Sequence, residues 1–133
     1  MKFYIACRFT KKEEVRQLQQ KLAALGHEIA YDWTTHKDMR PFDKNQKIAS
    51  EYAHNDIEGV RASDVFIALC DYSEGGVGMH TEIGAAISSK IEHGKPEIYI
   101  VGTTNTEALF YFHPLMVLLI SDPASQAWSC LWR

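Results

Sequence analysis

VFIALCDYSEGGVGMHTEIGAA, residues 65–86, joins an uninterrupted apolar run to a glycine-rich loop and the beginning of a helix. An apolar run such as 65–69 is typical of a central strand in a parallel sheet that helices cover on both faces. Three of the four residues from 75 to 78 are glycine, which lets backbone N–H groups turn inward towards a ligand. A helix is predicted over 81–93. Together these features indicate an α/β protein.

The same alternation of strands and helices continues on both sides of this segment. Thr10 followed by Glu13 has the capping-box pattern, which predicts that the first helix begins there. Alternation of this kind predicts a parallel sheet with right-handed crossovers. We therefore expect a single domain over 1–133, with a flavodoxin-like or Rossmann-like three-layer sandwich and a five-stranded, mainly parallel sheet. The other strands are predicted at 2–7, 28–32, 97–101 and 116–120, and the other helices at 10–25 and 45–62.

The composition argues against several classes of protein. The formal net charge is −3 and the basic residues are scattered, which argues against binding to a nucleic acid polymer. The 3 cysteines and 6 histidines show no CxxC or HExxH spacing, so we expect no metal site, no disulfide framework and no cofactor. No apolar run approaches the roughly 18 residues needed to span a bilayer, so no membrane partner is expected. Free thiols without an export signal predict a cytoplasmic protein.

The expected ligand site lies at one edge of the predicted sheet. Ligands of such sheets bind beyond the carboxyl ends of the strands, near the point where the strand order reverses. This rule places the loops after the first and third strands, 7–10 and 71–80, at one mouth. The polar segment 33–44 has no clear period and contains a proline. Loops of about a dozen residues are often functional lids, and this segment is a candidate for one.

Two carboxylates are candidates for chemistry. Glu82 is predicted in the first turn of its helix, where the dipole favours an ionised side chain. An ionised Glu suits attack on a sugar carbon or stabilisation of an oxocarbenium-like state, whereas the alternative is simple helix capping. Asp56 falls late in its helix, where the dipole disfavours a carboxylate. It is a candidate for orienting a base or donating a proton, and a solvated surface Asp is the alternative.

Three motifs, in this order, carry a resemblance to a known family: KFYIACRF at 2–9, NDIEGVRASDVFIAL at 55–69 and GGVGMHTEIGAA at 75–86. They resemble the nucleoside 2-deoxyribosyltransferase family, including the related deoxynucleoside 5′-monophosphate N-hydrolases. The resemblance implies that Glu82 is the nucleophile that attacks the anomeric carbon, that Asp56 contacts the base and helps proton transfer, and that Tyr4 positions the Glu. The predicted substrate-binding residues lie at the end of the first strand and around the glycine loop: Ala6, Cys7, Arg8, Gly76, Gly78 and His80.

The chain departs from the transferases of that family in two places. Gly76 occupies the position, six residues before the nucleophile, where the transferases carry a base-contacting Asp, and Glu74 or Asp71 could replace it. The Asn that transferases borrow from a partner subunit has no clear equivalent near the C-terminus. Arg8 is either a contact for a 5′-phosphate or a solvated loop residue.

The resemblance and its departures together predict the function. We expect cleavage of the N-glycosidic bond of a small-molecule (deoxy)nucleoside or nucleotide, by hydrolysis or by transfer to another base. The alternative is a nucleotide- or NAD-derivative-binding sensor with the same fold and little turnover. Because sites in that family are commonly completed by a neighbouring subunit, a homodimer or larger homo-oligomer is expected.

Overall fold

The computed structural model describes residues 1–71, 76–104 and 108–119, and over these ranges five strands form one parallel sheet. The strand order is β2-β1-β3-β4-β5, and every pairing is parallel. This confirms the predicted fold class. The predictions that concern Glu74 and the C-terminal tail lie outside the described residues. The strands are β1 (Lys2–Ala6), β2 (Glu28–Ile29), β3 (Val65–Asp71), β4 (Glu97–Thr103) and β5 (Met116–Leu119).

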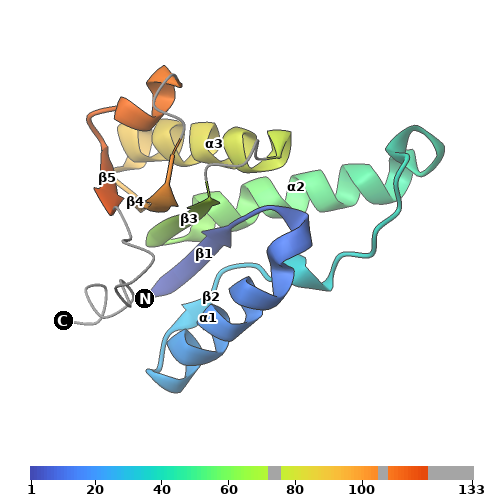
Figure 1. Ribbon diagram of the computed structural model, residues 1–133, viewed down its shortest axis with the longest axis horizontal. Helices are drawn as coiled ribbons and strands as arrows, with labels where there is room; N and C mark the ends of the chain where they lie inside the picture. The colour runs from blue at the N-terminus through green and yellow to red at the C-terminus, as the bar shows by residue number, and fades with distance from the viewer. Residues whose placement is uncertain (72–75, 105–107, 120–133) are drawn as a thin grey trace.

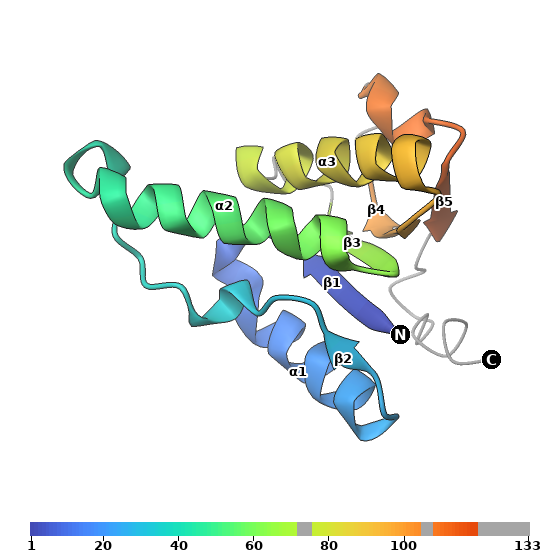
Figure 2. The same ribbon diagram turned by 180° about the vertical axis from the view of Figure 1, so that it is seen from behind.

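Helices cover both faces of the sheet. In Figures 1 and 2, α2 (Gln46–Ala62) and α3 (Val77–His93) lie side by side on one face, and α1 (Lys12–Ala24) lies on the other. The helices lie on these faces because their apolar side chains recur at helical spacing, as at Val15, Leu18 and Leu22 of α1, which are all buried. The central strands β1, β3 and β4 supply most of the core. None of the described helices has the length and apolarity needed to cross a bilayer.

Several predicted boundaries were wrong. A 3₁₀ turn, Phe9–Lys11, precedes α1, and the N-cap residue Lys11 makes no side-chain capping hydrogen bond, so the Thr10–Glu13 capping box does not begin the helix. The second strand, predicted over 28–32, is limited to the two residues of β2, at the edge of the sheet. The helix predicted over 81–93 begins at Val77. Gly78 lies in the first turn of this helix, where the backbone N–H groups have no hydrogen-bond partner within the helix whatever the residue.

The carboxyl ends of β1 and β3 are neighbours. Ala6 is paired with Ala68, so the loops that follow the two strands leave the sheet at the same edge. The chain runs from β1 to β2 on one side and from β3 to β4 on the other, so the strand order reverses between them. A parallel sheet binds its ligands at such a point.

Candidate active site

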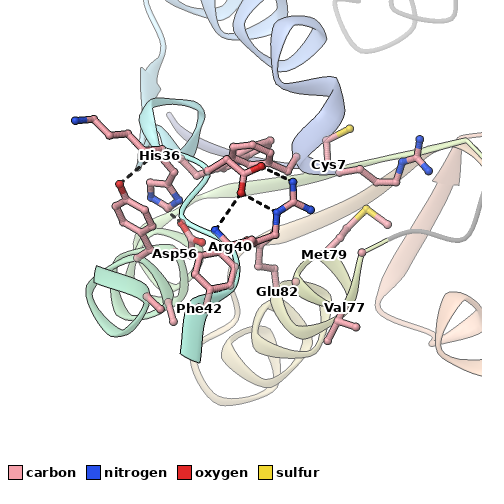
Figure 3. Close-up of a pocket in the computed structure, with 18 residues that line it drawn as sticks. Cys7, His36, Arg40, Phe42, Asp56, Val77, Met79 and Glu82 are labelled. Carbon is pink, nitrogen blue, oxygen red and sulfur yellow. Dashed lines mark hydrogen bonds and ion pairs between the residues drawn. The ribbon is translucent and has the colours of Figure 1, made fainter. Parts of the chain in front are cut away.

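A cavity of about 700 Å³ opens at the carboxyl ends of β1 and β3 (Figure 3). Its lining comes from the residues after β1, the segment 33–42, one face of α2 and the beginning of α3. Its volume lies within the range of small-molecule sites in proteins. The loops after the first and third strands therefore do meet at one mouth, as the sequence predicts.

Glu82 lies on the cavity wall, in the second turn of α3. The Tyr4 hydroxyl donates a hydrogen bond to Glu82 Oε1 at 2.9 Å. The Tyr4 side chain is fully buried, and its ring lies parallel to that of Phe66 with 5.9 Å between the centroids. A fully packed ring on a central strand can move little, so Tyr4 fixes the position of the Glu82 carboxyl group.

Asp56 lines the cavity from α2, the helix that lies beside the α3 of Glu82. Its Oδ1 atom is buried and has no hydrogen-bond partner, and it lies 3.7 Å from His36 Nε2. Burial raises the pKa of Asp56 to about 7, although the nearby Tyr4 hydroxyl offsets part of the increase. An unsatisfied buried oxygen that faces a cavity is suited to a hydrogen bond with a ligand.

The two carboxyl groups influence each other. Burial, and then the charge of Asp56, raise the pKa of Glu82 to about 8, and the hydrogen bond from Tyr4 lowers it only in part. The prediction that the helix dipole keeps Glu82 ionised is therefore wrong. Glu82 lies beyond the first turn, where the dipole is strongest, and the cost of desolvating its charge outweighs what remains. Between them, Asp56 and Glu82 retain a proton near neutral pH.

His36 is a cavity residue that the sequence analysis missed. Its ring is stacked on that of Tyr52, with 3.7 Å between centroids and 5° between planes, and its Nε2 lies 2.9 Å from the Tyr31 hydroxyl. Burial lowers the pKa of His36, and Asp32 offsets this only in part, so the imidazole is neutral near pH 7. The only sequence feature that points to His36 is its position in the segment predicted to be a lid. That segment has no hydrophobic period, so the sequence does not show which way the His36 side chain faces.

The segment around His36 contacts the residues after β1 through Arg40. Arg40 donates from Nε to Asp38 Oδ1 at 2.7 Å, and its guanidinium group lies 5.8 Å from the centroid of the Phe9 ring. Phe42 follows and is partly exposed at the edge of the cavity. That this segment opens and closes as a lid stays a prediction.

Arg8 lies where the chain leaves β1, and it lines the cavity together with Gly76 and Gly78. Its Nη2 lies 3.5 Å from Asp71 Oδ2, and its buried Nε has no hydrogen-bond partner among the residues that the structure describes. Cys7 also lines the cavity, but burial raises the pKa of its thiol to about 11. The thiol is therefore protonated and unsuited to act as a nucleophile.

Two of the predicted substrate-binding residues lie outside the cavity lining. Ala6 is fully buried within β1. His80 faces away, with Nε2 2.8 Å from the Tyr111 hydroxyl and Nδ1 3.3 Å from the Gly76 carbonyl oxygen. Because the helix begins before His80, residues 80 and 82 are separated by about 200° around its axis. His80 therefore supports the glycine loop from behind and does not point into the cavity.

The described residues offer no group of three or more His, Cys, Asp or Glu side chains that could hold a metal ion. The carboxyl pair, the neutral imidazole and the arginine are suited instead to acid–base and nucleophilic chemistry on an organic substrate.

Comparisons with known proteins agree with this geometry. The family model for nucleoside 2-deoxyribosyltransferase matches residues 3–111. The structure of a CMP N-glycosidase from Clostridium botulinum covers 100% of both chains at 16% identity, with a TM-score of 0.59. A 2-deoxyribosyltransferase from Bacillus psychrosaccharolyticus matches over 76% of this chain and 72% of its own, at 17% identity and a TM-score of 0.51. At such identities the two structures show a common fold. No curated protein sequence matches the chain.

Proposed function

The chain belongs to the nucleoside 2-deoxyribosyltransferase family, and on that basis we propose that it hydrolyses the N-glycosidic bond of a nucleoside 5′-monophosphate, with Glu82 as the nucleophile. The family consists of enzymes that act on small molecules of this kind, and both similar structures are of such enzymes. The observation that carries the proposal is the arrangement of Tyr4, Glu82 and Asp56: one carboxyl group held by a buried hydroxyl, and a second close enough to raise the pKa of the first.

The first step breaks the bond between the sugar and the base. A Glu82 oxygen attacks the anomeric carbon, the carbon–nitrogen bond breaks, and its electron pair stays with the base. Protonated Asp56 donates a proton to the departing base, so the base leaves uncharged. The products are a free base and a sugar phosphate held as an ester of Glu82. In the second step Asp56, now ionised, acts as the base. It accepts a proton from a water molecule while the water oxygen displaces Glu82 from the anomeric carbon.

The shared proton of the two carboxyl groups suits this sequence. Positive charge that develops on the sugar next to Glu82 favours its ionised form, and the proton then resides on Asp56, beside the base. The hydrogen bond from Tyr4 also stabilises the ionised form of Glu82. The singly protonated pair is therefore the reactive form. Because the pKa values are about 7 for Asp56 and about 8 for Glu82, we expect kcat/KM to be highest between pH 7 and 8 and to fall on both sides.

Arg8 supports a substrate that carries a phosphate. Its guanidinium group lies on the cavity wall beside Gly76 and Gly78 at the beginning of α3, and its buried Nε lacks a partner. A guanidinium group binds phosphate through paired hydrogen bonds, and backbone N–H groups at a helix N-terminus add favourable dipoles. An Arg8→Ala variant should raise KM for nucleoside monophosphates at least tenfold and leave kinetics with the parent nucleosides nearly unchanged.

Water, rather than a second base, is proposed as the acceptor because Gly76, which has no side chain, stands six residues before Glu82, where the transferases carry an Asp. A transferase must hold the incoming base long enough for it to displace Glu82, whereas water needs no such site. Adding an excess of free base tests this step: base exchange at a rate comparable to base release would show a transferase instead.

The deciding experiment follows the release of free base by chromatography from a panel of nucleosides and nucleoside 5′-monophosphates. The wild-type protein should release base without an acceptor. Glu82→Gln and Glu82→Ala should reduce the rate at least a thousandfold, whereas Glu92→Gln, an exposed glutamate on the same helix, should leave it unchanged. Activity that survives in Glu82→Ala would show that this mechanism is wrong.

A sensor with little turnover is the second candidate, and the raised pKa of Glu82 favours it. A carboxyl group whose pKa is about 8 is largely protonated at neutral pH. A protonated carboxyl group can still bind a ligand but is a poor nucleophile. Tight binding of a nucleotide or an NAD derivative, with no base released over hours, would support the sensor and exclude the hydrolase.

A further inference from the structure

The two ends of the cavity differ in chemistry. In Figure 3, Cys7, Met79 and Val77 lie on one side of Glu82, whereas His36, Asp56 and Phe42 lie on the other. The first end also contains the partnerless Nε of Arg8 and the glycines at the beginning of α3. The second end lies against α2. Under the proposed function, the base leaves towards its proton donor, Asp56, so this second end holds the base.

Two alanines extend this base end along α2. Ala49, Ala53 and Asp56 are spaced i, i+4 and i+7, so they share one face of the helix, and all three line the cavity. At 1.5 Å per residue, Ala49 lies about 10 Å along the helix axis from Asp56. An alanine presents only one methyl group, so the two turns of α2 beyond the proton donor leave open space where larger side chains would fill the cavity.

Aromatic groups line the rest of this end. The parallel pair of His36 and Tyr52 lies next to Asp56, and Phe42 reaches the same part of the cavity from the lid segment. Ring faces and alanine methyl groups offer stacking and apolar contact, which every base can use. Contacts of this kind distinguish bases chiefly by size, because a larger base covers more of the ring faces and methyl groups.

We propose that this base slot, bounded by Ala49, Tyr52, Ala53 and Phe42, is sized for a two-ring purine base, and that Ala49 and Ala53 are its specificity-determining residues. The inference rests on the proposed function for the position of the base. A purine whose glycosidic nitrogen lies at Asp56 extends along α2 past Ala53. A single-ring base in the same position ends short of Ala53 and leaves both alanines without contact, so it loses dispersion attraction.

The test places larger side chains in the slot. Ala53→Leu and Ala49→Leu each add three carbon atoms at the positions that only a purine reaches. We expect kcat/KM for adenosine and guanosine 5′-monophosphates, or their deoxy forms, to fall about 10- to 100-fold, as for other pockets that lose or gain a few carbon atoms. For cytidine and uridine monophosphates it should change less than threefold. Ala62→Leu, an exposed alanine on the same helix outside the cavity lining, controls for the substitution itself.

A binding measurement separates this inference from the proposed function. In Glu82→Gln, calorimetric titration should show adenosine monophosphate binding at least tenfold more tightly than cytidine monophosphate, and adding Ala53→Leu should remove that difference. If no nucleotide is cleaved but this binding pattern is found, the proposed function fails and the slot stands. Equal or tighter binding of cytidine monophosphate, or an equal loss for both nucleotides in Ala53→Leu, would overturn the slot even if hydrolysis is confirmed.

Discussion

The single hydrogen bond from Tyr4 to Glu82 links the core of the sheet to the chemistry of the cavity. Tyr4 is fully buried in β1, and its hydroxyl lowers a pKa that burial would otherwise raise further. The bond therefore both fixes the carboxyl group and keeps its ionised form within reach at neutral pH. Neither effect requires contact between Tyr4 and the substrate, so Tyr4 is a positioning residue.

Replacing Tyr4 with Phe should separate these effects from simple loss of structure. The variant removes the donor, so the pKa of Glu82 rises and the alkaline limb of the kcat/KM profile, at about pH 8, moves to higher pH. Because a hydrogen bond to a charged group contributes about 1.5–3 kcal/mol, kcat at neutral pH should fall roughly 10- to 100-fold. Tyr99→Phe, on β4 and outside the cavity lining, is the matched control. A kcat/KM profile that is lower but not shifted in pH would argue against an electrostatic role of Tyr4.

The buried carboxyl pair also makes the stability of the fold depend on pH. Groups whose pKa is raised on folding stabilise the protein fully below their unfolded pKa, and this stabilisation is lost as the pH rises through the folded values, which are about 7 for Asp56 and about 8 for Glu82. Glu82→Gln removes one buried charge and can still accept the bond from Tyr4. It should have nearly the wild-type free energy of unfolding at pH 5, and exceed it by roughly 2 kcal/mol or more at pH 9.

Urea denaturation at the two pH values measures this difference, with Glu92→Gln as the exposed control. A Glu82→Gln variant that is less stable than the wild type at pH 9 would show that Glu82 is well solvated when ionised, contrary to its burial in the structure.

At the scale of single residues, the sequence predicted which residues form the site better than it predicted the surroundings of each side chain. The motifs selected Tyr4, Asp56 and Glu82, and the structure brings the three together. The ionisation of Glu82 was predicted wrongly, because a pattern of residue types does not show how far a side chain is desolvated. His36 was missed because it lies in a segment without a period, and only the fold shows which way such a side chain faces.

At the scale of secondary-structure elements, the close packing of α2 on β1 positions Tyr4. The contact is made at Gly59, which is buried. A Cβ atom added there would lie 2.5 Å from Tyr31 Cβ, closer than such atoms approach, and 3.0 Å from Tyr4 Cε2, which is tighter than most such contacts. The absence of a side chain at Gly59 therefore lets the helix that carries Asp56 approach the strand that carries Tyr4.

Gly59→Ala should force α2 away from β1. Since overpacking of a core costs typically about 1–3 kcal/mol, we expect the free energy of unfolding to fall by that amount, and kcat to fall with it because Asp56 and Tyr4 separate. The matched control is Gly84→Ala in α3, where an added Cβ meets nothing within 4 Å. Since Ala favours a helix interior over Gly by roughly 0.5–1 kcal/mol, the control should be slightly stabilised. Equal effects of the two changes would contradict the packing argument.

The sequence located every strand and every α-helix that the described residues contain, but not the 3₁₀ turns, and it did not predict where the elements begin and end. The beginning of α3 is the clearest example. Glycines at 76 and 78 indicated a loop, yet the helix includes Gly78. The difference matters for function, because it moves Glu82 out of the first turn and rotates His80 away from the cavity. Local preferences near a helix end are weak, and packing against β3 and α2 determines the boundary.

At the scale of the whole molecule, the fold could be predicted because the alternation of strands and helices permits few arrangements of a parallel sheet. The strand order also placed the cavity correctly, since ligands bind where that order reverses. The reaction is a different matter, because one fold supports several chemistries. The cytoplasmic location and the homodimer or larger homo-oligomer stay predictions, and sedimentation equilibrium of the full chain checks the second.

Binding in the cavity should stabilise the entire domain, because its walls come from the residues after β1, the lid segment, α2 and α3 together. A ligand that binds only the folded state adds about 2.7 kcal/mol when present at a hundred times its Kd, which corresponds to roughly 10 °C in Tm for a chain of this size. Glu82→Gln preserves the ligand during the measurement, so nucleoside monophosphates should raise its Tm by that amount. Parent nucleosides should raise the Tm less at equal concentration, because they lack the group that Arg8 binds. An Arg8→Ala, Glu82→Gln double variant should lose this difference between nucleotide and nucleoside. If nucleotide and nucleoside raise the Tm of Glu82→Gln equally, Arg8 is a solvated loop residue and the substrate is not selected by its phosphate.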